Sequence, residues 1–119
     1  MKIEKKLAIA WTVCIIIGSL LPSAFVKIQM LDSITGSDKY LHITVYAIAA
    51  CIWLISSGKV RTEERVVLLS GLCLMGFFLE ILQITINTGR FFEWYDALAN
   101  CIGVFAGFLI YNFFLKSIY

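Results

Sequence analysis

The chain has 119 residues, of which 61% are hydrophobic and 15% charged, with a formal net charge of +2. Soluble globular domains usually contain about 45–50% apolar and about 25% charged residues, so this composition argues against a soluble fold. The lysines and arginines form no basic stripe, so the sequence predicts no nucleic-acid partner.

The hydrophobic residues occur in four long runs, separated by short charged clusters. A membrane-spanning helix needs about 20 apolar residues to cross a hydrocarbon core of about 30 Å. The sequence therefore predicts an all-α membrane protein with a single domain over residues 1–119, folded as a bundle of four transmembrane helices. The predicted spans are Leu7–Val26, Lys39–Ser57, Val66–Asn87 and Asp96–Lys116. The first run, which follows the basic start MKIEKK, also fits a signal peptide, but it is long for one.

Basic residues predict the orientation, because segments rich in lysine and arginine stay on the cytoplasmic side during insertion. Seven basic residues fall on the side of the two termini and three on the other side. The first set is Lys2, Lys5, Lys6, Lys59, Arg61, Arg65 and Lys116, and the second is Lys27, Lys39 and Arg90. Both termini are therefore expected in the cytoplasm.

Polar residues gather at the predicted outer ends of the spans. The stretch DKYLHITVY begins the second span with Asp38 and Lys39, and His42 and Tyr46 follow four residues apart. That spacing places His42 and Tyr46 on one face of a helix. The second span therefore begins with an acid, a base and a histidine where lipid-facing residues would be expected.

The third and fourth spans add polar residues at similar depths. Glu80 and Gln83 lie one helical turn apart, and Asp96 and Asn100 open the fourth span. At a rise of about 1.5 Å per residue, Glu80 lies on the order of 10 Å below the outer rim, and His42 and Asn100 lie about 6 Å below it. Three helices are therefore expected to present hydrogen-bonding groups in one outer band.

Glu80 needs a partner or a proton, because an ionisable group within a span costs about 2.5–3.5 kcal/mol or more. Candidate partners are His42, Lys39 and Arg90, the last of which lies in the short outer loop NTGRFFEWYD. An alternative interpretation is that the outer charges simply neutralise one another and hold the bundle together. Their number argues against this alternative, because helices in membranes usually associate through small residues.

Small residues follow one ridge of the fourth span. Ala99, Gly103 and Gly107 are spaced four residues apart and predict a helix-packing surface, either within the monomer or in a homodimer. The four cysteines lie inside predicted spans without a CxxC spacing, so they are interpreted as small packing residues. The sequence predicts no cofactor and no dedicated metal site.

Several motifs occur in an order that resembles a known family. DKYLHITVY follows a first span that ends in a proline, and EILQ, GR and DALANCIGVFAG come after it. From about Ser19 to Tyr111 the chain resembles the VanZ-like family of small bacterial membrane proteins. The resemblance implies a multi-pass protein of the bacterial cytoplasmic membrane and a link to resistance to the lipoglycopeptide teicoplanin. It also implies that the recurring residues of the family are Asp38, Lys39, His42, Tyr46, Glu80, Gln83, Gly89, Arg90, Asp96, Asn100, Gly103 and Gly107.

A binding module is the first of three functions that fit this pattern. The outer band would hold a lipid headgroup, a lipid-linked cell-wall intermediate or a lipoglycopeptide. Lys39 and Arg90 would contact phosphate or carboxylate, since arginine offers a planar pair of donors. The candidate ligand-binding residues are Asp38, Lys39, His42, Tyr46, Glu80, Gln83, Arg90, Asp96 and Asn100.

The second function is an intramembrane enzyme that modifies lipid headgroups or lipid-linked sugars. His42 would act as general acid or base, with Asp38, Glu80 or Asp96 orienting it or holding a divalent metal. The candidate catalytic residues are His42, Glu80 and Asp96, and no clear nucleophile accompanies them. The third function is a structural or assembly role, in which the polar band fixes the register of the helices.

Overall fold

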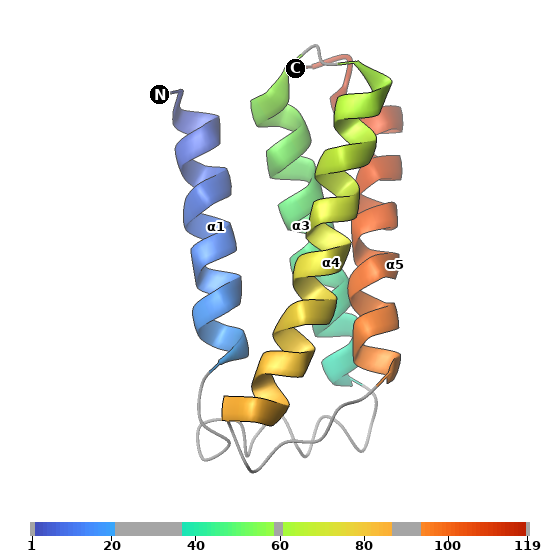
Figure 1. Cartoon of the computed structure of the whole chain (residues 1–119). Helices are drawn as coiled ribbons and strands as arrows, with labels where there is room; N and C mark the ends of the chain where they lie inside the picture. The colour runs from blue at the N-terminus through green and yellow to red at the C-terminus, as the bar shows by residue number, and fades with distance from the viewer. Residues whose placement is uncertain (1, 21–36, 59–60, 87–93, 119) are drawn as a thin grey trace.

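The structure, a computed structural model, describes residues 2–20, 37–58, 61–86 and 94–118. These residues form four α-helices, which are α1 (Ile3–Ser19), α3 (Ser37–Ser57), α4 (Thr62–Ile86) and α5 (Trp94–Ile110). A π-helical segment, η2 (Tyr111–Leu115), continues α5, and no strand occurs within these ranges. Successive helices run in opposite directions, so that α1 begins and η2 ends at the same end of the bundle (Figure 1). The prediction of an all-helical protein is confirmed.

Within the part of the chain that the structure describes, three helical segments are long and apolar enough to cross a membrane. They are Lys39–Ser57, Thr62–Gln83 and Trp94–Leu115. Large apolar side chains cover the outside of the bundle; for example, Leu74 is 68% exposed and Phe105 is 61% exposed. Soluble proteins rarely expose so much apolar surface, whereas a lipid environment favours it. These three segments agree with the second, third and fourth predicted spans.

The bounds of the helices differ from the predicted spans at some ends. The helix α4 begins at Thr62 instead of Val66, because Glu63 and Glu64 lie in its first turn, where the helix dipole favours negative charge. The helix α1 has 17 residues, which corresponds to about 26 Å. Its described part ends before Val26, so a membrane crossing by α1 stays a prediction, as does the cytoplasmic location of both termini.

The helices α3 and α5 pack closely through the glycines of α5. A Cβ atom added at Gly103 would collide with the carbonyl oxygen of Ile43, and one added at Gly107 would collide with that of Ala47. The thiol of Cys51 donates a hydrogen bond to the carbonyl oxygen of Gly107, with an Sγ to O distance of 3.3 Å. The glycine ridge thus lies against α3 within one chain, and a homodimer through the fourth span stays a prediction.

The helix α4 covers the joined pair of α3 and α5. At Gly76 an added Cβ would lie 3.0 Å from the side chain of Asn100 and 3.2 Å from the ring of Tyr46, so this glycine makes room for both. Deeper in the bundle the three helices share an apolar core with α1. Its buried members are Ile15, Tyr46, Ala49, Ala50, Leu72, Leu79 and Val104.

Two tryptophans attach α1 to α3. The indole nitrogen of Trp11 donates to the carbonyl oxygen of Val45 at 3.0 Å. The indole nitrogen of Trp53 donates to the hydroxyl oxygen of Thr12 at 2.9 Å. Lipid tails are as apolar as the side chains, so the hydrophobic effect does not drive helices together in a membrane. Packing and interhelical hydrogen bonds of this kind hold them together instead.

Candidate functional site

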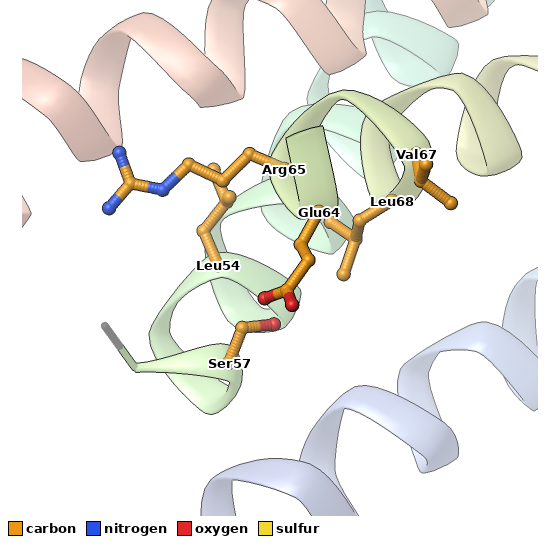
Figure 2. A pocket seen from close by; sticks show the side chains of 6 residues that line it. All are labelled: Leu54, Ser57, Glu64, Arg65, Val67 and Leu68. Carbon is orange, nitrogen blue, oxygen red and sulfur yellow. The ribbon is translucent and has the colours of Figure 1, made fainter. Parts of the chain in front are cut away.

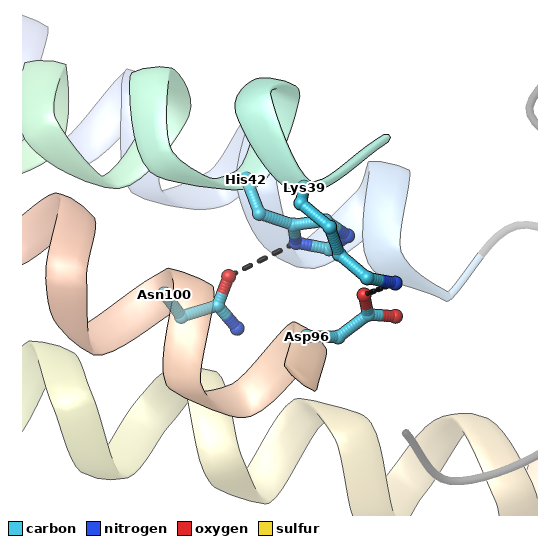
Figure 3. Close-up of polar contacts among 4 residues, drawn as sticks. All are labelled: Lys39, His42, Asp96 and Asn100. Carbon is cyan, nitrogen blue, oxygen red and sulfur yellow. Dashed lines mark hydrogen bonds and ion pairs between the residues drawn. The ribbon is translucent and has the colours of Figure 1, made fainter. Parts of the chain in front are cut away.

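The first turns of α3 and α5 carry an ion pair between the two helices. Because the glycine ridge holds the backbones of these helices together, Lys39 of α3 reaches Asp96 of α5 (Figure 3). The two side chains are 26% and 15% exposed, respectively. The pair therefore lies near the end of the bundle, where it is only partly screened by solvent.

One turn further in, the same two helices are joined by a second polar contact. The Nδ1 atom of His42 lies 2.9 Å from the Oδ1 atom of Asn100. An amide oxygen only accepts hydrogen bonds, so Nδ1 of His42 donates, and in the neutral imidazole Nε2 then keeps its lone pair. Asn100 is 2% exposed, so its amide is enclosed by the bundle, and the hydrogen bond to it orients the His42 ring.

The helix α4 contributes Glu80 to the same region. Its side chain is only 2% exposed, although it carries an ionisable group, and the nearby Gln83 is 5% exposed. His42, Glu80 and Asp96 each offer one ligand atom, and these three atoms all lie within 4.8 Å of one another. Three helices thus deliver a histidine and two carboxyl groups to a single point.

Of the predicted site residues, the structure brings together five, which we call the polar cluster. Its members are Lys39, His42, Glu80, Asp96 and Asn100. Tyr46 is buried below the cluster, on the same face of α3 as His42. Gln83 is buried on α4, and Ala99 is buried on α5.

Three predicted residues are not placed by the structure. Asp38 lies in the first turn of α3, but its side chain is outside the described part of the chain. Gly89 and Arg90 also fall outside the described residues. Their assignment to the site stays a prediction.

Gly76 is a residue of the site that the motifs do not reveal. It precedes Glu80 by one helical turn, and it leaves the space that Asn100 and the ring of Tyr46 occupy. Its only signal in the sequence is its small size at a position one turn from an intramembrane acid. Small residues at such positions allow helices to approach closely.

The opposite end of the bundle holds a cavity of about 380 Å³. Its lining is mainly apolar and comes from the end of α3 and the start of α4, namely Leu54, Ser57, Glu64, Arg65, Val67 and Leu68 (Figure 2). The side chain of Arg65 extends away from Glu64, and its guanidinium carbon lies 5.9 Å from the ring centre of Tyr111. Among the lining residues that the structure describes, the acid is Glu64, which is half exposed, so this cavity offers less chemistry than the polar cluster.

A family model described as VanZ/LLP1 matches residues 7–115, which include every helix that carries the polar cluster. The chain belongs to the VanZ/LLP1 family. As a VanZ/LLP1 protein with three membrane-capable helices, it is a membrane protein. Neither the curated proteins nor the solved structures that were compared with it include a match.

Proposed function

We propose that this VanZ/LLP1 protein binds the polar headgroup of a lipid-bearing molecule in the outer leaflet of the bacterial cytoplasmic membrane. The ligand would be a membrane lipid, a lipid-linked cell-wall intermediate or a lipoglycopeptide of the teicoplanin type, which share an apolar tail and a polar head. The polar cluster would contact the head, and the apolar outer faces of α3, α4 and α5 would contact the tail.

One observation carries the proposal, namely the burial of Glu80 beside two other ionisable side chains at one point. Glu80 is 2% exposed and comes within 4.8 Å, atom to atom, of both His42 and Asp96. An ionisable residue within a span usually faces protein or a water-filled space and marks a functional site. Its presence on a third helix, facing the first turns of the other two, supports a site instead of an isolated ion pair.

Cohesion of the bundle does not require this arrangement. The helices α3 and α5 already touch through Gly103 and Gly107, where the space between the backbones has no room for a Cβ atom. Buried ionic groups add little stability compared with apolar residues that fill the same space. A protein that needed only cohesion would lose little by replacing the cluster with apolar side chains.

The cluster has donors and acceptors that match a zwitterionic or amine-bearing head. The ammonium of Lys39 is 26% exposed and can donate to phosphate or carboxylate oxygens. The carboxyl groups of Glu80 and Asp96 can accept from amine or hydroxyl groups. Because the cluster lies near one end of the helices, a head would reach it while its tail stays in the bilayer.

Native mass spectrometry of the purified full-length protein tests the proposal. The wild type is expected to retain a lipid-bearing molecule, and Glu80→Gln, which keeps the shape of the side chain but not its charge, is expected to lose it. Glu63→Gln provides the control, because that carboxyl group is 80% exposed at the opposite end of α4. Equal retention by all three proteins, each with native helix content, would contradict the proposal.

A membrane-embedded enzyme is the second candidate, favoured by the orientation of His42. Its Nδ1 donates to Asn100, so Nε2 keeps a lone pair that can act as a base, and one ring nitrogen lies within 4.8 Å of carboxyl oxygens of Glu80 and Asp96. The two functions are separated by comparing envelope lipids in cells that express the wild type or Glu80→Gln at equal levels. A lipid made or consumed only with the wild type would establish catalysis, whereas unchanged pools with a retained lipid would establish binding.

A further inference from the structure

We propose that His42, Glu80 and Asp96 form a binding site for one divalent transition-metal ion. The site takes one ligand from each of three helices, namely a ring nitrogen from α3 and a carboxyl oxygen each from α4 and α5. The further role of the ion, which is to bridge the protein to an anionic headgroup, rests on the proposed function. Imidazole nitrogen together with carboxylate oxygen suits Zn²⁺ or Mn²⁺.

The separations of the ligand atoms fit a site that closes around an ion. With metal to ligand distances of about 2.1 Å, the ligand atoms of a tetrahedral site lie about 3.4 Å apart. The three atoms here lie within 4.8 Å of one another, so rotations that move each side chain by roughly 1 Å would complete the site.

The orientation of His42 independently points to a metal ligand. A histidine that binds a metal through one ring nitrogen usually donates the other N–H to a polar partner, which fixes the tautomer and the direction of the ring. In this protein the partner is the amide oxygen of the buried Asn100, 2.9 Å from Nδ1. The other ring nitrogen points toward the end of the bundle where Lys39 and Asp96 lie (Figure 3).

The charges of the cluster also favour an added cation. When both carboxyl groups are deprotonated, as metal binding requires, the cluster with its ammonium and a neutral imidazole has a formal charge of −1. A divalent ion changes this charge to +1 and turns the cluster into a site for phosphate. Three protein ligands leave at least one coordination position open, so a phosphate oxygen can complete the shell of the ion.

Electron paramagnetic resonance of Mn²⁺ provides the direct test. Full-length protein in lipid nanodiscs, stripped of metals with a chelator, is titrated with MnCl₂, and Zn²⁺ is then added as a competitor. We expect one saturable site per chain, displaced by Zn²⁺, with hyperfine coupling to a histidine nitrogen. Because the chain contains one histidine, such a coupling identifies His42 without any substitution. Absence of the coupling from bound Mn²⁺ would overturn the inference.

Variants give a second readout. His42→Ala, Glu80→Gln and Asp96→Asn are each expected to weaken Mn²⁺ binding at least tenfold, whereas Glu63→Gln is expected to leave it unchanged. Circular dichroism and size-exclusion chromatography establish that each variant is folded. Unchanged affinity in folded Glu80→Gln would contradict the proposed ligand set.

Measuring retained lipid in the same samples separates this inference from the proposed function. Loss of the lipid after chelation, and its recovery on adding Mn²⁺, would support the metal bridge. A retained lipid without a manganese site would overturn the metal inference and leave the proposed function intact. A manganese site without any retained lipid would support the ion site and overturn the proposed function.

Discussion

Replacing Gly107 by alanine is expected to push α3 and α5 apart. A Cβ atom at this position would lie 2.8 Å from the Cβ of Ala50, about 0.6 Å closer than the 3.4 Å at which ordinary van der Waals contact begins. It would also collide with the backbone oxygen of Ala47, which no change of rotamer can relieve. Overpacking of this kind costs about 1–3 kcal/mol.

Gly71→Ala is the matched control, because nothing lies within 4 Å of a Cβ added there. Both substitutions replace a helical glycine by alanine. This replacement alone stabilises a helix by about 0.5–1 kcal/mol. The difference between Gly107→Ala and Gly71→Ala therefore isolates the overpacking and should be about 1–3 kcal/mol in the free energy of unfolding. Reversible unfolding in mixed micelles measures it, and equal free energies for the two variants would refute the close packing of α3 and α5.

Two further predictions concern the contacts around the polar cluster and along α1. In a double-mutant cycle, Lys39→Met and Asp96→Asn should show a coupling of about 0.5–3 kcal/mol in the free energy of unfolding, and a coupling near zero would argue against the ion pair. Trp53→Phe removes the hydrogen bond to Thr12 and should lower the free energy of unfolding by about 0.5–1.5 kcal/mol. Trp53→Phe in a Thr12→Val background should then cost less than in the wild type, and an unchanged cost would contradict the assigned bond.

The helices were predictable from the sequence because long apolar runs have few alternatives to a membrane helix. The three segments that can cross a membrane agree with runs of apolar residues, and their ends differ by only a few residues from the predicted spans. The differences arise where charged residues such as Glu63 and Glu64 extend a helix beyond its apolar part. The length of an apolar run alone does not predict such extensions.

Depth along the helices was also predictable, whereas the pairing of side chains was not. Counting residues placed His42, Glu80 and Asn100 in one band, and the structure brings them to one place. The count does not give the rotation of each helix about its axis. That rotation is fixed by Gly103 and Gly107, which seat α5 on α3 and bring Asp96 to Lys39 and Asn100 to His42.

No short sequence motif predicts that the histidine and the two carboxyl groups meet. Their positions in the chain lie 38 and 16 residues apart, so no short spacing connects His42 to Glu80 or Glu80 to Asp96. Only the packing of three helices brings their ligand atoms within 4.8 Å of one another. Gly76, which gives Asn100 its space, likewise acquires its role only from the neighbouring helices.

The retention of a lipid-bearing molecule by wild type, Glu80→Gln and Glu63→Gln tests the central claim most directly. Native mass spectrometry, on proteins purified in the same mild detergent, gives the ratio of lipid-bound to lipid-free chain for each. The polar cluster predicts a high ratio for wild type and Glu63→Gln and a low ratio for Glu80→Gln. Equal ratios in the three folded proteins would contradict a headgroup site at Glu80.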